Sequence, residues 1–223
     1  MQFSIWESKM TINLEILDTA FIYEQDEIVE LKTKELVPKM VTRRRLTRGA
    51  KIAIYLANAV DFKIGRIVYG SSFGEIPATA SILKSIKCND HISPTDFQNS
   101  VYNTAASYLS MLYGNKSEIM TVSSGDNTAQ NLLKMGAIKA LDGDEILIIA
   151  TETLNIPNIN EVNNCIDYLE SGVALKIKVT QMSPNIDINK DNNSIKIPNS
   201  LYELFAIAKK FDKTKQNIVE IKI

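Results

Sequence analysis

The sequence contains few of the residues that carry most enzyme chemistry. Its 223 residues include two cysteines, Cys88 and Cys165, and one histidine, His91. The cysteines lie far apart without CxxC spacing, which argues against a zinc site, a disulfide framework and a thioredoxin-like motif. We therefore expect a protein of the reducing cytoplasm with no metal and no cofactor. Acid–base catalysis near neutral pH most often uses histidine. His91 stands beside "SPTD", which indicates a loop, and we assign it no role.

The sequence also lacks an excess of charge and any long apolar run. With 25 basic and 26 acidic residues its formal net charge is −1, so no general attraction to nucleic acid or anionic membranes is expected. No apolar run approaches the ~18 to 20 residues of a membrane span. The N-terminal "MQFSIWESKMTINLE" has no apolar core of a secretory signal. We expect a soluble protein with no nucleic-acid partner and no membrane span.

What the sequence does contain is a regular alternation of apolar patterns. Alternating or continuous apolar runs predict strands at 11–23, 64–70, 118–124, 145–152, 173–181 and 217–223. Apolar residues three and four apart predict helices at 45–61, 77–87, 96–112, 127–141, about 160–170 and 200–210, the last opened by a Ser200/Glu203 capping box. This order predicts an α/β layered fold with a largely buried mixed sheet in one domain, 1–223.

The segment "TVSSG" (121–125) ends a predicted strand and precedes a predicted helix, a layout in which many α/β enzymes hold a nucleophile. It resembles the G-x-S-x-G elbow of serine hydrolases with Ser123 in the centre, but the first glycine is missing. The one histidine also precedes the serine, whereas the hydrolase order places it last. An ordinary glycine turn is therefore favoured. Ser124 or Asp126 is expected to accept N–H bonds from the first turn of the helix.

The segment "DINKDNNS" (187–194) spaces its polar residues like the first ligands of a calcium loop. The pattern then fails, because the sixth position is Asn192 rather than glycine and the twelfth is Pro198, which has no carboxylate. A solvated surface loop is the favoured interpretation.

The stretch "RRRLTR" places Arg43, Arg44, Arg45 and Arg48 at the start of a predicted helix, where cations oppose the helix dipole. A local conflict of this kind favours a functional role, and guanidinium groups suit carboxylates and phosphates through their forked geometry. The alternative is a solvated cap whose arginines pair with the acidic stretch "EQDEIVE" (24–30). The sequence leaves both interpretations open.

Four segments together resemble a known family. They are "RRRLTRGAKIAIYLAN", "IVYGSSFGEIPATASIL", "SPTDFQNSVYNTAASYLSMLYG" and "VSSGDNTAQNLLKMGAIKALDGDEILIIATE". In order and spacing they resemble the β-ketoacyl synthase-like proteins of the short, N-terminal-domain type, often described as chain-length-factor-like. These are similar to components of aryl polyene and related type II fatty acid or polyketide pathways. The resemblance covers about 38–155, and the Asn-containing helix followed by "S-x-x-x-G" is matched by Asn103, Ser110 and Gly114.

The resemblance implies a thiolase-like fold, here an N-terminal half with an abbreviated C-terminal part. In active condensing enzymes a cysteine stands at the elbow, and two histidines lie in the second half of the fold. The cysteine position falls on Gly125, or on Ser124 or Asp126 if the register slips by one. No histidine follows residue 150. Because covalent catalysis requires its nucleophile, the chain alone is expected not to catalyse condensation.

The resemblance thus implies a non-catalytic subunit that pairs with a full-length, active β-ketoacyl synthase and helps to shape its acyl pocket, with acyl carrier protein as a further partner. The expected interface and pocket residues are Ser100, Val101, Asn103, Thr104, Ser107 and Tyr108. Of these, Val101 and Tyr108, with Ala105, also fit plain core. The four arginines are expected to contact the carrier protein or the synthase. Two alternatives stay open: a self-associating acyl or small-ligand binding module, and an enzyme that uses Ser123 or Asp126.

Overall fold

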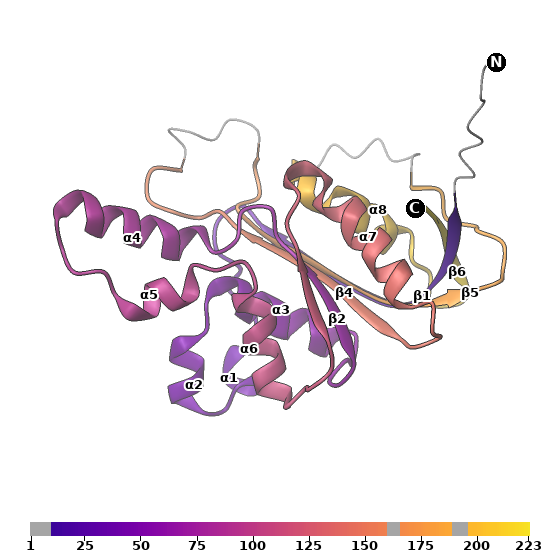
Figure 1. The fold of residues 1–223 in the computed structure, drawn as a ribbon, viewed down its shortest axis with the longest axis horizontal. Helices are drawn as coiled ribbons and strands as arrows, with labels where there is room; N and C mark the ends of the chain where they lie inside the picture. The colour runs from indigo at the N-terminus through magenta and orange to yellow at the C-terminus, as the bar shows by residue number, and fades with distance from the viewer. Residues whose placement is uncertain (1–9, 160–165, 189–195) are drawn as a thin grey trace, which may run out of the picture.

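Six strands form one mixed sheet in the computed structural model, which describes residues 10–159, 166–188 and 196–223. They are β1 (Thr11–Glu24), β2 (Arg66–Gly70), β3 (Ile119–Val122), β4 (Ile146–Thr153), β5 (Glu170–Thr180) and β6 (Asn217–Lys222). The order across the sheet is β3-β2-β4-β5-β1-β6 (Figure 1). β3, β2 and β4 are parallel, and the other neighbours are antiparallel. The predicted mixed sheet is confirmed.

Helices cover both faces of this sheet. The α-helices are α1 (Thr33–Leu36), α2 (Met40–Arg45), α3 (Arg48–Ala59), α4 (Ile76–Cys88), α5 (Pro94–Asn99), α6 (Thr104–Tyr113), α7 (Thr128–Lys139) and α8 (Tyr202–Lys210). Two 3-10 helices, η1 (Gly125–Asn127) and η4 (Asn199–Leu201), precede α7 and α8. α7 and α8 pack on one face, and α3 and α6 pack on the other (Figure 1). None of the helices in the described residues is long and apolar enough to cross a membrane.

β4 is buried along its whole length because both helical layers cover it. Ile146 and Ile148 belong to the core formed with α7 and α8, whereas Leu147 and Ile149 belong to the core formed with α3 and α6. Successive side chains of a strand point to opposite faces, so a strand covered on both sides needs a continuous apolar sequence. α7 lies especially close to β4 at Gly136, where an added Cβ would lie 2.5 Å from the Cδ1 of Ile148.

The residues beyond 155 complete the same sheet. β5 lies between β4 and β1, and β6 pairs with the outer side of β1. α8 packs beside α7, and its Phe205 is fully buried against the aromatic rings of Phe21 and Tyr23 on β1. Among residues 166–188 and 196–223 the chain therefore adds strands and a helix to the first sheet and builds no second sheet.

The helix predicted for 45–61 begins later than expected. Leu46 is extended, with φ −67° and ψ 130°, and Thr47 caps α3 by accepting the Ala50 N–H on its Oγ1 at 3.1 Å. The three preceding arginines lie instead in the last turn of the separate helix α2, where cations complement the helix dipole. The predicted conflict with the dipole is therefore wrong for these three, and only Arg48 opens α3.

The helix predicted for 96–112 is two helices, α5 and α6, with a break between them. Ser100 ends α5, and its Oγ donates to the Phe97 carbonyl at 2.9 Å, a local bond that competes with helix continuation. The break changes which side chains are buried. The apolar stripe of the predicted helix, which begins at Phe97 and includes Val101 and Ala105, is not buried throughout: Phe97 and Val101 are 69% and 50% exposed, whereas Ala105 is fully buried as predicted.

Three further local predictions are corrected or fall outside the described residues. The capping box at 200–203 does not form, because the Ser200 hydroxyl turns inward to Glu152 and η4 precedes α8. The helix near 160–170 lies partly outside the described residues. Its described part, 166–169, is not helical, and Glu170 already begins β5. Cys165 and most of the calcium-like segment 187–194 also lie outside the described residues.

Candidate functional site

The predicted elbow lies at the C-terminal end of β3, where η1 leads into α7. Gly125 opens η1 with φ +57°, a left-handed conformation that favours glycine. Thr128 closes the turn: its Oγ1 accepts the Ser124 N–H at 3.0 Å and donates to the Gly125 carbonyl at 2.6 Å. Neither Ser124 nor Asp126 caps the helix, contrary to prediction, and the Asp126 carboxylate accepts instead from Asn199 at 3.4 Å.

The elbow has no activated nucleophile within the described residues. No hydrogen bond joins the hydroxyl of Ser123 or Ser124 to a histidine, carboxylate or lysine in that part of the chain. His91 lies in the loop that joins α4 to α5, at the far left of Figure 1, whereas α7 begins near the top centre. No group of three or more His, Cys, Asp or Glu side chains that could hold a metal ion occurs in the described residues.

A buried carboxylate lies at the end of β4, close to this elbow in the sheet. Glu152 is fully buried and accepts four hydrogen bonds: from the Ser71 Oγ at 2.8 Å, the Ser72 N–H at 2.6 Å, the Phe73 N–H at 3.2 Å and the Ser200 Oγ at 2.7 Å. Burial raises the pKa of Glu152, and these four bonds oppose the rise. The side chain joins the loop after β2 to η4, and thus ties the C-terminal part of the chain to the parallel strands.

A second buried carboxylate, Glu75, joins the start of α4 to the start of α3. Its Oε1 accepts from the Thr47 Oγ1 at 2.5 Å, and an added Cβ on Gly49 would lie 2.7 Å from the same oxygen. Burial raises the pKa of Glu75 to about 7, with a further increase from the nearby charge of Glu170 and opposition from the bonds to Thr47 and the Gly49 N–H. We call this contact the α3/α4 junction, formed by Thr47, Gly49 and Glu75.

Arg48 is held inside the molecule by carboxylates. Its guanidinium donates to both carboxylate oxygens of Glu170, at 2.8 and 2.5 Å, and to the Ile28 carbonyl at 2.8 Å. It also pairs with Glu27 at 2.8 Å. Burial lowers the pKa of Arg48, but the carboxylates of Glu170 and Glu27 raise it more. The pKa of Arg48 therefore lies above its usual range. For Arg48 the predicted pairing with the acidic stretch 24–30 is confirmed.

The other three arginines lie on α2 and differ in what they contact. The guanidinium of Arg43 donates to the carbonyls of Val37 and Pro38 at 2.8 and 3.0 Å, so it joins α2 to the segment that precedes it. Arg44 and Arg45 are exposed, and no ion pair or hydrogen bond to either occurs among the described residues. These two cations are free to meet a partner or a ligand.

The six predicted interface residues lie at the end of α5, in the break and on α6. They are Ser100, Val101, Asn103, Thr104, Ser107 and Tyr108. Thr104 is buried, and its Oγ1 donates to the Asn99 carbonyl at 3.2 Å. Tyr108 is half-buried and donates to the Asn99 Oδ1 at 3.2 Å. Val101 and Asn103 are exposed. The break thus exposes Val101 and Asn103 to solvent, whereas Thr104 and Tyr108 join α6 to α5 through Asn99.

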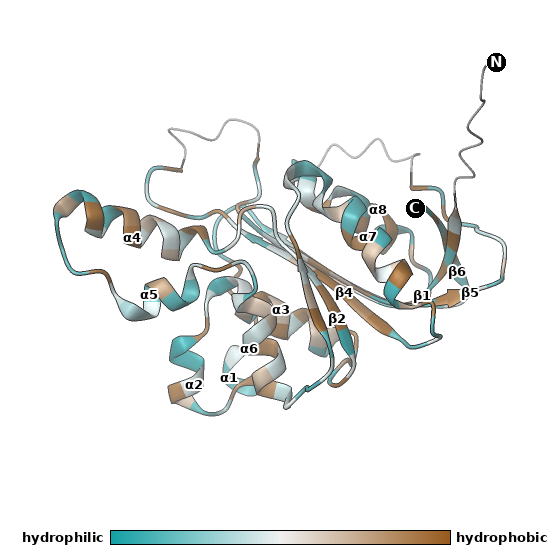
Figure 2. Cartoon of the chain, viewed as in Figure 1, coloured by the Kyte–Doolittle hydropathy of each residue, from teal (hydrophilic) through white to brown (hydrophobic). Residues whose placement is uncertain are grey.

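Exposed apolar side chains also lie on α4 and α5, which we call the α4–α5 arm (residues 76–99). No residue of α4 is buried, although the helix has 13 residues and carries Leu83 and Ile86 on its exposed surface. On α5, Phe97 is also exposed. The Ser81 hydroxyl donates to Asp96 at 2.7 Å and joins the two helices. Figures 1 and 2 show this arm extending to the left of the sheet, with several apolar residues along it.

β3 is the edge strand on the parallel side of the sheet. Within the described part of the chain it pairs with β2 only, and all four of its residues are half-buried. The main-chain N–H and C=O groups of its outer side have no strand partner among the described residues, and such an edge is a ready template for pairing with another chain. The edge strand leads directly into the elbow.

The buried glutamates at positions 75, 152 and 170 are not among the residues predicted from the sequence. One signal for Glu152 was present, because "EILIIATE" ends an apolar strand with a carboxylate, and a carboxylate at the end of a fully buried strand needs polar partners. No comparable signal marks the other two, since their partners on α3 come from distant parts of the chain.

Comparison with known proteins gives a family and a fold. A family model described as beta-ketoacyl synthase, N-terminal domain, matches residues 21–204. A structure of the ketosynthase ApeO in complex with its chain length factor ApeC, from Xenorhabdus doucetiae, is similar at 21% identity and a TM-score of 0.67. The match covers 90% of this chain and 93% of the matched chain. No curated protein matches the sequence.

Two further structures are similar at lower identity. The ishigamide ketosynthase/chain length factor matches at 9% identity and a TM-score of 0.61, over 79% of this chain and 64% of that one. A type II PKS acyl-carrier protein in complex with its ketosynthase, AntDE:AntF, matches at 14% identity and a TM-score of 0.59, over 77% and 64%. At such identities the similarity concerns the fold, and the predicted thiolase-like fold of ketosynthases is confirmed.

Proposed function

Because the chain belongs to the β-ketoacyl synthase family, matched through its N-terminal domain, we propose that it is a non-catalytic, chain-length-factor-like subunit. Residues 1–223 would form one ketosynthase-like unit that pairs with a full-length, active β-ketoacyl synthase. The elbow supports this proposal, since Gly125 offers no nucleophile and, among the described residues, neither the Ser123 nor the Ser124 hydroxyl is hydrogen-bonded to a base. A similar solved structure is that of a ketosynthase in complex with its chain length factor.

The observation that carries the proposal is the α4–α5 arm. An isolated helix shorter than about 12 to 15 residues is marginal in water, and most helices are stabilised by packing an apolar face. α4 has 13 residues and none of them is buried. Leu83, Ile86 and Phe97 therefore lie where a second protein can bury them. Exposed apolar surface of this kind is typical of protein–protein interfaces.

The pairing would extend the sheet and shape an acyl pocket. The β3 edge can add the edge strand of a partner, since its outer hydrogen-bonding groups are unpaired in the described part of the chain. The segment with Ser100, Val101, Asn103 and Tyr108 lies beside the arm. We propose that its side chains form the far end of the synthase's acyl pocket and limit chain length by volume, in fatty acid or polyene biosynthesis.

The arginines on α2 would attract acyl carrier protein, which is acidic, or fix the synthase. Arg44 and Arg45 supply this charge, because Arg43 and Arg48 are engaged within the chain. Attraction of this sort raises association rates and weakens with added salt. Arg44→Glu combined with Arg45→Glu should weaken binding of the carrier protein or of the synthase. If both interactions persist unchanged, this part of the proposal is wrong.

The pairing is tested by co-expression with a full-length β-ketoacyl synthase encoded beside this chain, followed by size-exclusion chromatography and an elongation assay. We expect one co-eluting complex that elongates acyl chains on carrier protein. Leu83→Asp should weaken the complex at least tenfold, because it removes an apolar contact and buries a charge. Ile64→Asp is the matched control, an exposed isoleucine before β2 and away from the arm.

Two outcomes would replace the proposal. A stable homodimer that ignores the synthase would favour a self-associating binding module. Turnover of an acyl thioester by the isolated chain, abolished by Ser123→Ala, would favour an enzyme. If the Leu83 variant binds the synthase as the wild type does, the arm is not the interface, and β3 becomes the surface to test next.

A further inference from the structure

A cavity of about 780 Å³ lies on the α3/α6 side of the sheet, away from the elbow. It is open to solvent and is lined by the segment before α2, by α2 itself, by α5 and by α6. The apolar residues of its wall are Val37, Pro38, Val41, Tyr108, Met111 and Leu112. Its volume lies within the range of about 300 to 1,000 Å³ that is typical of small-molecule sites. An apolar body of moderate size can therefore be accommodated.

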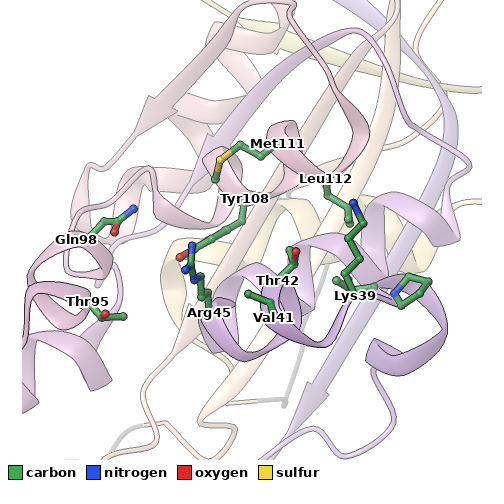
Figure 3. A pocket seen from close by; sticks show the side chains of 11 residues that line it. Lys39, Val41, Thr42, Arg45, Thr95, Gln98, Tyr108, Met111 and Leu112 are labelled. Atoms are coloured by element: carbon green, nitrogen blue, oxygen red, sulfur yellow. The ribbon is translucent and has the colours of Figure 1, made fainter.

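The charged groups of this cavity are all positive. Lys39 and Arg45 line it, and no acidic residue does. Thr95 and Gln98 of α5 add uncharged polar groups. In Figure 3, Arg45 lies beside Tyr108 in the middle of the lining, with Lys39 at one end and Thr95 and Gln98 at the other. A ligand in the cavity would meet cations from two directions.

Another cavity of the same protein differs in the charge of its lining. The second cavity, of about 470 Å³, lies between α7 and β6, and its charged lining residues are Lys134, Asp187, Glu203, Glu220 and Lys222. Both signs are present there, so the charges of its lining can compensate one another. In the first cavity no lining residue carries a compensating negative charge.

The side chains of Lys39 and Arg45 also have no polar partner among the described residues. No hydrogen bond or ion pair joins either side chain to another group there, in contrast to the neighbouring Arg43, which holds two backbone carbonyls. Exposed cations on a convex surface are normally satisfied by water. Here they line a concavity whose wall is largely apolar, where a bound anion would gain charge-assisted hydrogen bonds and its hydrocarbon part would leave water.

We propose that this cavity binds a small amphiphilic carboxylate, with an alkyl or aryl body against Met111, Leu112 and Val41 and with its carboxylate between Arg45 and Lys39. The forked guanidinium suits a carboxylate, and the ammonium adds a second positive charge. The site is formed by this chain alone and goes beyond the pairing proposed above, although it shares Arg45 and Tyr108 with the surfaces proposed there for partner proteins. Because α2 and α5 both line the cavity, a bound ligand also bridges α2 to the α4–α5 arm.

The test uses the full chain alone, labelled with ¹³C at the methionine methyl groups, and titrated with sodium octanoate. Among the methionines of the described residues, Met111 is the one that lines the cavity. We expect a saturable shift of its methyl signal, assigned with Met111→Leu, and little change in the others. Acetate, which lacks the alkyl body, and 1-octanol, which lacks the charge, should bind at least tenfold more weakly.

Arg45→Gln and Lys39→Gln should each weaken octanoate binding about tenfold. Arg44→Gln is the matched control, because it removes a neighbouring exposed cation that does not line the cavity. All three variants change exposed side chains and should unfold like the wild type. Octanoate binding that 1-octanol equals, that shifts the methionine signals indiscriminately, or that the Arg45 and Lys39 variants retain at wild-type strength would overturn the proposal. None of these outcomes depends on whether the chain pairs with a synthase.

Discussion

Replacing Glu75 by glutamine should change how the stability of the protein depends on pH. Burial raises the pKa of Glu75 from its ordinary value of 4.5 to about 7, so the folded protein holds this proton in a range where the unfolded chain has lost it. Between these two values the unfolded state binds fewer protons than the folded state, and the free energy of unfolding therefore falls as pH rises. Below 4.5 and above 7 both states carry the same charge at this position.

The size of the effect follows from the pKa difference. A rise from 4.5 to about 7 is about 2.5 pKa units, and at about 1.4 kcal/mol per unit the loss of stability amounts to about 3 kcal/mol. Glu75→Gln cannot ionise, and its amide oxygen can still accept from the Thr47 hydroxyl at the α3/α4 junction. The variant should match the wild type near pH 4.5, within about 1 kcal/mol. Its advantage should grow to about 3 kcal/mol by pH 7 to 8.

The assay is urea unfolding of both proteins, followed by circular dichroism at half-unit steps from pH 4.5 to 8. The difference between the two free energies of unfolding isolates this position, because Glu152 and Glu203, whose pKa values are also raised, are common to both proteins. Glu35→Gln serves as the control, since it removes an exposed glutamate on α1. A difference that stays constant with pH, or a slope of the same size in the control, would refute the reasoning.

Three other substitutions test the contacts that hold the fold. Ser200→Ala should lower the free energy of unfolding by about 1 to 3 kcal/mol, because it removes a donor from the buried carboxylate of Glu152. Gly136→Ala should lower it by about 1 to 3 kcal/mol through overpacking against Ile148, and thermal unfolding will show this. Arg48→Met should cost about 3 to 5 kcal/mol in urea unfolding, since it leaves the carboxylate on β5 buried without a cation.

The strands of the fold could be predicted well from the sequence because the order of apolar and polar residues along each strand indicates which of its faces are buried. Apolar and polar residues alternate in the first half of β1, whereas β4 begins with a continuous apolar run and is buried along its whole length. Both strands lie within one or two residues of their predicted bounds. The helices were less predictable where a side chain ends them. Thr47 and Ser100 each interrupt an apolar stripe that would otherwise continue, and neither interruption changes the spacing of the apolar residues.

The site could be predicted only where it is local in the chain. The strand, turn and helix around Gly125 are in place, since the turn depends on residues within four positions of one another. The junction at Glu75 and the pair between Arg48 and Glu170 join segments far apart in the sequence, so no spacing indicates them. The cavity beside α2 was hidden for the same reason, because the break after α5 sets how α5 and α6 face α2.

The position of β1 in the sheet affects how the protein can fold while it is being synthesised. Its two neighbours are the last two strands, with Glu24 opposite Glu170 and Thr11 opposite Lys222. A ribosome that adds about 5 to 20 residues per second therefore releases β1 on the order of ten seconds or more before its partners exist. Until then a long strand with both edges open must stay apart from other chains. Slower synthesis of the segment between β1 and β5 should therefore increase association of the nascent chain with other chains.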